Sequence, residues 1–160
     1  MSECKRMAEL YRSVYEGEKG EAWHGPALLP LLKDVTAEQA SLTPVAGAHS
    51  IIQLVWHLAY WEEIVLRRFS GELANAALND ENDWPQNRRV SADEWQSALL
   101  RLDRSHKALQ SAIAGCADVR LEEKVIGRDY SLYILLHGTV DHCVYHSAQI
   151  ALLKKALSSS

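Results

Sequence analysis

The sequence lacks the features of a membrane protein or a nucleic-acid-binding protein. No run approaches the roughly 20 apolar residues of a membrane span, and charged residues lie close to Met1, where a signal peptide would carry an apolar stretch. No basic cluster is longer than a pair such as Arg67–Arg68, and 17 basic residues stand against 21 acidic ones. Because a nucleic-acid surface usually shows a basic face, we expect neither nucleic acid nor membrane among the partners.

Cysteine is also scarce. The three cysteines, Cys4, Cys116 and Cys143, are odd in number and widely and irregularly spaced, which suits a reducing compartment better than a disulfide framework. We therefore expect three free thiols and a cytoplasmic location. For Cys143 the alternative is a metal or redox role, which its position about 100° around a helix from His142 disfavours.

Helix signals recur along the chain. Apolar side chains at helical spacing mark a first helix over residues 3–16. Two later helices, over about 50–69 and 91–114, begin at capping boxes, in which a Ser hydroxyl and a Gln or Glu side chain satisfy free amides of the first turn. A last helix is predicted over about 131–157, and the longest connection covers about 71–90. These segments predict an all-α protein, either an up-and-down four-helix bundle or a variant with one long crossover connection.

Length and composition fit a single domain covering residues 1–160. Gly138 stands inside the last predicted helix at a cost of about 1 kcal/mol relative to Ala, so either a closely packed neighbour or open space for a ligand would explain it. The acidic stretch Asn79–Asp83 lacks the glycine and the glutamate of a calcium-binding loop. We expect it to be solvated surface.

Two histidines in the last predicted helix have the spacing of metal ligands. His142 and His146 lie four residues apart, about 40° around the helix and 6 Å along its axis, so both rings can reach one ion. Imidazole nitrogen suits zinc, nickel, copper or iron. Such a pair alone is weak evidence, and a third ligand is needed to support a metal site.

His57 supplies this third candidate. It lies in the middle of an otherwise apolar helix, where a polar ring without a partner would be costly. Hydrogen bonding to a carbonyl or carboxylate in the core is the alternative. However, His57 lies about 7 residues into its helix and His142 and His146 about 11–15 into theirs, depths that antiparallel or crossing helices can bring level. We therefore predict that His57, His142 and His146 bind one divalent ion.

The remaining histidines suit other roles. His24 and His49 lie in turn-like settings, and His106 belongs to the apolar stripe of the third long helix. His137 lies about 140° around the helix from His142, so we assign it either a structural role or a role in orienting a ligand of the ion. No glutamate follows His142, so the zinc-protease motif is absent and proteolysis is not expected.

An ion bound by three neutral nitrogens keeps its charge and an open position, which would lower the pKa of a bound water or thiol. Trp61, Tyr145 and Gln149, which follow or flank the three histidines, are candidates for the substrate pocket. The two aromatic residues fit equally well as ordinary core side chains. Asp141 or Glu62 could orient a ligand histidine, a choice that depends on three-dimensional contacts.

Three stretches resemble the DinB-like superfamily, also described as YfiT-like metal-dependent hydrolases: Trp23–Leu28, Gly47–Trp61 and His137–Ile150. The resemblance implies a four-helix bundle of up-down-down-up or similar topology, frequently a homodimer. It also implies that nickel or zinc is held by a histidine triad, which falls on His57, His142 and His146.

Characterised members of this superfamily include transferases and isomerases that use low-molecular-weight thiols such as bacillithiol, mycothiol or glutathione. We therefore expect transfer of a small thiol to an electrophile, or a thiol-assisted isomerisation. The alternatives are metal-dependent hydrolysis and a non-catalytic, metal-binding stress-response bundle. Fold alone does not decide among them.

Overall fold

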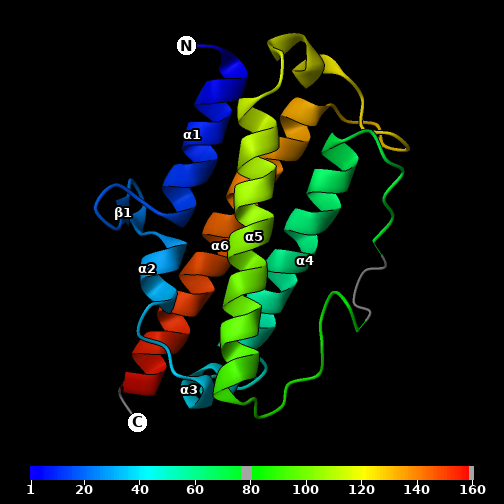
Figure 1. Cartoon of the computed structure of the whole chain (residues 1–160). Helices are drawn as coiled ribbons and strands as arrows, with labels where there is room; N and C mark the ends of the chain where they lie inside the picture. The colour runs from blue at the N-terminus through cyan, green and yellow to red at the C-terminus, as the bar shows by residue number, and fades with distance from the viewer. Residues whose placement is uncertain (77–80, 159–160) are drawn as a thin grey trace.

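The computed structural model describes residues 1–76 and 81–158, and in this part of the chain four long helices form a bundle. They are listed in chain order: α1 (Glu3–Tyr15), α4 (Ile51–Phe69), α5 (Ala92–Ala114) and α6 (Leu132–Ser158). In Figure 1 α1 and α6 run in one direction, and α4 and α5 run in the other. A long crossover joins the parallel pair α4 and α5. The predicted all-α bundle of up-down-down-up topology is therefore confirmed.

The helices begin where side chains cap them. Ser50 and Gln53 form the capping box of α4, and Ser91 and Glu94 form that of α5, as predicted. A third capping box, which our prediction missed, begins at Thr36. It opens a helix of only five residues, too short for a periodic apolar pattern to reveal it.

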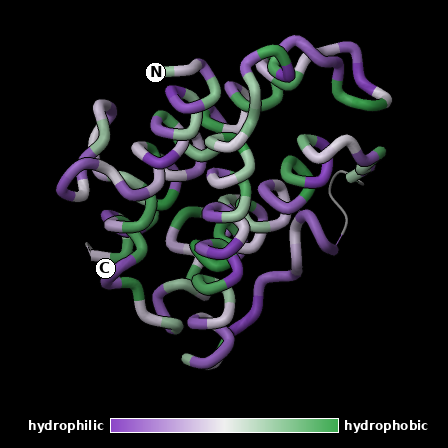
Figure 2. Tube along the Cα trace, turned by 45° about the horizontal axis from the view of Figure 1, so that its top comes forward, coloured by the Kyte–Doolittle hydropathy of each residue, from purple (hydrophilic) through white to green (hydrophobic). Residues whose placement is uncertain are grey.

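Short elements connect the long helices. β1 (Glu21–Ala22) pairs antiparallel with β2 (Gly25–Pro26), and α2 (Leu28–Leu32) and α3 (Ala37–Ser41) lead into α4. A 3-10 helix, η1 (Asp118–Glu122), lies between α5 and α6. The crossover from α4 to α5 contains no helix or strand among its described residues, and its second part is mostly hydrophilic in Figure 2.

Helix α6 is apolar on most of its surface and packs against α1, α2 and α4. Its buried Leu136, Val140 and Ile150 belong to the same hydrophobic core as Tyr11 of α1 and Leu58 of α4. Burying each such side chain contributes about 1.5–3 kcal/mol. This packing holds α6 antiparallel to α4 and fixes which of their side chains meet.

Cys4 and Cys116 form a disulfide, with 6.0 Å between their Cα atoms, so the expectation of free thiols is wrong for these two residues. They are 112 positions apart, but α1 and α5 are antiparallel, which brings the start of α1 close to the end of α5. Asp118 joins the same ends, since its carboxylate accepts hydrogen bonds from the backbone N–H groups of Glu3 and Cys4, both at 2.9 Å. Cys143 is a free, buried thiol. The cysteines therefore no longer support a reducing compartment.

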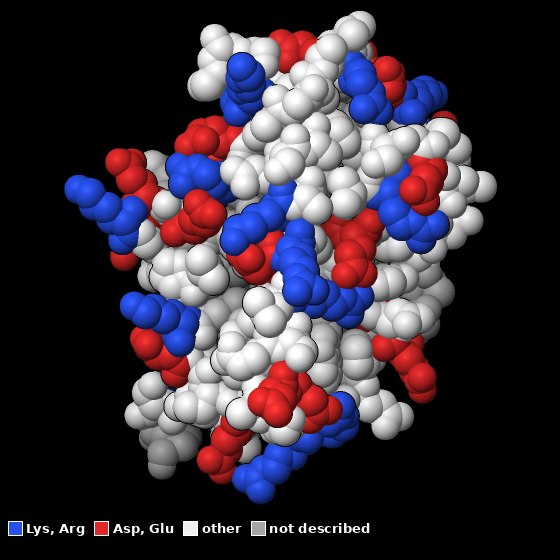
Figure 3. Space-filling model, in the orientation of Figure 1, with Lys and Arg blue, Asp and Glu red and all other residues white. Residues whose placement is uncertain are grey.

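Positive and negative side chains alternate on the face of the molecule shown in Figure 3. In the described part of the chain, oppositely charged side chains form ion pairs, including Arg101 with Glu63 at 2.7 Å and Arg12 with Glu16 at 3.2 Å. This face carries no extended patch of one charge. Among the described residues, no helix has the length and apolar character to cross a membrane.

Candidate metal centre

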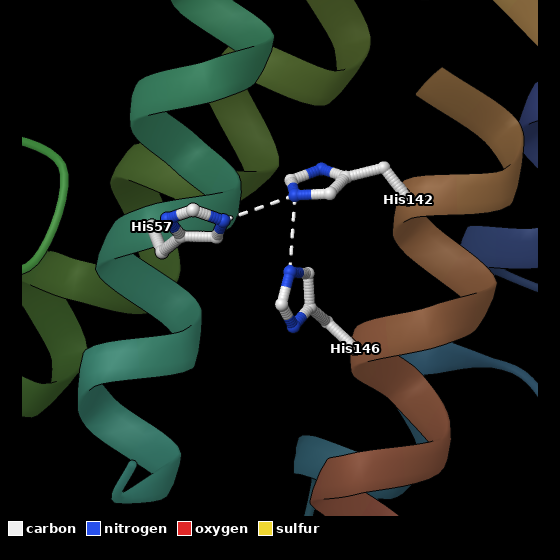
Figure 4. Close-up of side chains that lie close together, drawn as sticks. All are labelled: His57, His142 and His146. Carbon is white, nitrogen blue, oxygen red and sulfur yellow. Dashed lines mark hydrogen bonds between the residues drawn. The ribbon is translucent and has the colours of Figure 1, made fainter. Parts of the chain in front are cut away.

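Three imidazole rings meet between α4 and α6 (Figure 4). His57 projects from α4, and His142 and His146 project from successive turns of α6. The Nε2 atom of His142 lies 3.0 Å from Nε2 of His57 and 3.0 Å from Nε2 of His146. The antiparallel packing of the two helices thus brings together the three residues that the spacing singled out.

Hydrogen bonds set the tautomers of two of these rings. Nδ1 of His57 lies 2.7 Å from Oδ1 of Asp83, and Nδ1 of His146 lies 2.8 Å from Oε1 of Gln149. Because both oxygens are acceptors, each Nδ1 carries the proton and each Nε2 keeps its lone pair. The Nε2 lone pairs of His57 and His146 both point at Nε2 of His142. A proton on that nitrogen can form a hydrogen bond with only one of the two lone pairs. A cation satisfies all three nitrogens.

The spacing of the nitrogens suits a transition metal. With zinc–nitrogen bonds of about 2.0–2.1 Å, two ligand nitrogens lie about 2.9–3.4 Å apart for angles between octahedral and tetrahedral values. Two of the three separations, both 3.0 Å, fall inside that range, and the three ligand nitrogens all lie within 4.8 Å of one another. The three side chains could therefore hold a metal ion.

All three histidines are neutral at neutral pH, as metal ligands must be. Burial, together with the neighbouring rings, lowers the pKa of His142 to about 3. Burial also lowers the pKa of His146 to about 4, although the hydrogen bond with Gln149 opposes it. For His57 burial lowers the pKa despite the nearby carboxylate of Asp83.

The crossover between α4 and α5 completes the site. Asp83 is 2% exposed, and its Oδ1 accepts hydrogen bonds from both His57 and, at 2.7 Å, Nε1 of Trp61. The ring of Trp84 stacks between His57 and His49, with centroid distances of 3.8 and 3.6 Å. These contacts hold the His57 ring in position from the side opposite to α6.

Our expectation of solvated surface over Asn79–Asp83 is wrong for Asp83, whereas residues 79–80 lie outside the described residues. The long crossover returns along the bundle and buries this carboxylate against α4. A signal was present in the sequence, because Trp84 and Pro85 directly follow the acidic stretch. Asp141 is exposed, and the Glu62 carboxylate accepts hydrogen bonds from Tyr11 and Ser105. Neither carboxylate therefore orients a ligand histidine.

A cavity of about 530 Å³ opens beside the histidines. His57, His142 and Trp61 line it, and apolar side chains form much of the remaining wall. Tyr145 and Gln149 do not line this cavity. Tyr145 is 63% exposed, because it lies about 100° around α6 from His146, and Gln149 instead binds the His146 ring.

Gly138 lies on the wall of the cavity, and a Cβ atom added to it would meet no atom within 4 Å. Open space therefore explains this glycine rather than close packing. We expect Gly138→Ala to raise the free energy of unfolding by up to about 1 kcal/mol, because alanine favours the helix. Thermal denaturation should show a rise of roughly 2–4 °C in Tm.

Gly127→Ala is the matched control for this substitution. Gly127 has a φ of +74°, and a Cβ atom there would lie 2.7 Å from Cδ1 of Leu73, so we expect this variant to lose stability. A lower Tm for Gly138→Ala would contradict the assignment of open space.

A second polar cluster surrounds the buried carboxylate of Glu62, at the cavity wall. Tyr11 donates a hydrogen bond to it, Ser105 donates another at 2.6 Å, and Nδ1 of His106 lies 3.1 Å away. The His106 ring is stacked between Tyr11 and Tyr15. The carboxylate is thus engaged within the core, and this cluster ties α1, α4 and α5 together.

The nearby thiol of Cys143 is not poised for reaction. Burial and the charge of Glu62 raise its pKa to about 12, so the thiolate is absent at neutral pH. His137 also lies away from the three convergent nitrogens and packs against Tyr133. His24 is exposed on the hairpin between β1 and β2.

Comparison with protein families matches residues 22–150 to the DinB superfamily. No curated protein and no solved structure matches the chain. The matched segment includes all three histidines of the site and most of the bundle. Since the match covers well over half of its length, the chain belongs to the DinB superfamily.

Proposed function

We propose that the chain is a metalloenzyme in which the Nε2 atoms of His57, His142 and His146 bind one divalent ion, nickel or zinc. The observation that carries this proposal is the convergence of three neutral imidazole nitrogens, two of them oriented by acceptors on Nδ1. Oriented ligands of this kind are typical of metal sites. Three protein ligands leave at least one position open, as in catalytic sites.

The reaction we propose is transfer of a low-molecular-weight thiol to an electrophile, or a thiol-assisted isomerisation. A divalent ion at this site would lower the pKa of a thiol or water that binds it. The cavity gives a substrate room next to His57 and His142, and Trp61 shapes one wall. An external thiol is required, because Cys143 is protonated and buried and the other two cysteines form the disulfide.

Metal content tests the site directly. We expect about one zinc or nickel per chain in the wild type after loading and dialysis, and less than about one tenth of that in His57→Ala, since two ligands on one helix bind weakly. His24→Ala is the matched control, because His24 is exposed and remote from the site. Equal metal content in wild type and His57→Ala would overturn the triad.

Enzyme assays with and without a small thiol distinguish thiol transfer from hydrolysis. The metal-loaded protein, offered a panel of electrophiles, should consume them only when a small thiol is added. Consumption without thiol would indicate hydrolysis instead. In a non-catalytic bundle, thiols would not change the spectrum of the cobalt-substituted protein. A homodimer, which the resemblance implies, completes the proposal.

A further inference from the structure

Arg68 is a buried arginine on the wall of the cavity. It is 7% exposed, its Nε donates a hydrogen bond to the carbonyl of Ala74 at 3.0 Å, and its guanidinium carbon lies 5.7 Å from the ring centre of Trp61. Within residues 1–76 and 81–158, no carboxylate pairs with it, and its two terminal nitrogens donate no hydrogen bond. A buried charge without a counter-ion is costly, so its presence calls for an explanation.

The neighbouring Arg67 shows how an arginine is usually accommodated, at the surface and beside a carboxylate. Arg67 is exposed and pairs with Glu72, its Nε lying 2.8 Å from the carboxylate. Burial lowers the pKa of Arg68, and the nearby charge of Arg128 adds to this effect; among the described residues, Arg128 donates hydrogen bonds to the amide oxygen of Asn75 and to the backbone carbonyl of Gly127. At the Arg68 end of the cavity, no carboxylate among the described residues neutralises this positive charge.

Arg68 also lies in line with the metal centre. It follows His57 by 11 residues, which is about three turns of α4 and about 16 Å along its axis, on nearly the same face. Trp61 and Val65 lie between them on the same wall of the cavity. Long side chains on a helix lean toward its N-terminus, so the guanidinium leans from its own turn toward the histidines.

The wall between these two ends is mostly apolar. Leu58, Val65, Ile134 and Leu135 contribute to it. The two carboxylates that also line the cavity are engaged within the protein: Glu62 accepts hydrogen bonds from Tyr11 and Ser105, and Asp83 from Trp61. A bound molecule would therefore meet His57 and His142 at one end of the cavity, an apolar wall in the middle, and the Arg68 guanidinium at the other end.

We propose that Arg68 binds the carboxylate of the substrate, and that the substrate is a small organic acid with an apolar body. A guanidinium offers parallel N–H groups that match the two oxygens of a carboxylate. The other end of this acid would then lie near the three histidines and react with the thiol, a step that rests on the proposed function. The contact between Arg68 and the carboxylate does not need the metal.

Titration calorimetry with the metal-free protein tests the contact. The probes are 4-phenylbutyrate and its neutral amide, which have the same apolar body. The chelator-treated wild type should bind the carboxylate at least tenfold more tightly than the amide. In Arg68→Met, which keeps the apolar stem, carboxylate affinity should fall at least tenfold while the amide is unaffected. The matched control Arg67→Met should bind both probes as the wild type does.

Arg68→Lys guards against a folding defect in Arg68→Met, because it keeps the charge and loses the two-pronged geometry. We expect it to bind the carboxylate with an affinity between those of wild type and Arg68→Met. Equal affinities for the acid and the amide in the wild type, or a carboxylate affinity that neither Arg68 variant changes, would overturn the proposal. Equal metal content in wild type and His57→Ala, with carboxylate binding by Arg68 intact, would instead refute only the proposed function of the histidines.

Discussion

Replacing Cys4 by serine is expected to lower the free energy of unfolding by about 2–5 kcal/mol. The disulfide with Cys116 closes a loop of 112 residues, and a cross-link over so long a loop restricts the unfolded chain strongly. At roughly 2–4 °C per kcal/mol, Tm should fall by about 4–20 °C. Chemical denaturation followed by circular dichroism measures the change.

A reductant provides the control for this prediction. It should shift the unfolding curve of the wild type to that of Cys4→Ser and leave the variant unchanged. Thiol titration without reductant should find no reactive thiol in the native wild type, because Cys143 is buried with a pKa raised to about 12. The unfolded, unreduced protein should show one thiol, and three thiols there would contradict the disulfide.

Removing the Asp83 carboxylate is expected to weaken zinc binding by 10–100-fold. Asp83 accepts hydrogen bonds from His57 and Trp61, so Asp83→Ala removes the acceptor 2.7 Å from Nδ1 of His57 and leaves only the longer contact of 3.3 Å with the backbone carbonyl of residue 83 to orient the ring. The carboxylate also adds negative charge beside the three neutral ligands. Competition with a chelator of known affinity measures the zinc Kd.

Trp61→Phe separates the two roles of Asp83. This variant loses the hydrogen bond from the Trp61 indole but keeps the contact between Asp83 and His57, so we expect a smaller change in zinc affinity. Circular dichroism of each variant should retain the helical signal. A zinc Kd unchanged in Asp83→Ala would show that the crossover does not orient the ligand.

The helices of the bundle could be predicted because their signals are local. The capping boxes at Ser50 and Ser91 and the periodic apolar residues that follow act within one or a few turns of the backbone. The short α3 (Ala37–Ser41) escaped prediction although its capping box at Thr36 is equally regular, because five residues carry no periodicity. Local signals thus identified elements long enough to show an amphipathic pattern.

The candidate ligands were predictable for a related reason. His142 and His146 face the same way on one helix whatever surrounds them, and a polar ring in the apolar centre of α4 requires a partner. The choice of pocket residues was less successful. Trp61 lines the cavity, whereas Tyr145 points to solvent, because adjacent positions on α6 diverge by about 100° and proximity in sequence does not place a side chain.

The sequence by itself determined where the long helices begin and end, which connection between them is the longest, and which three histidines could share an ion. Only the tertiary structure decided that the crossover brings Asp83 and Trp84 against His57, that Cys4 meets Cys116, and that Arg68 lies at the far end of the cavity with no carboxylate partner among residues 1–76 and 81–158. Helix caps and helix faces depend on residues a few positions apart. These other contacts join segments tens of residues apart, and their formation depends on the path of the loops and on the packing of whole helices, which no local pattern of residues records.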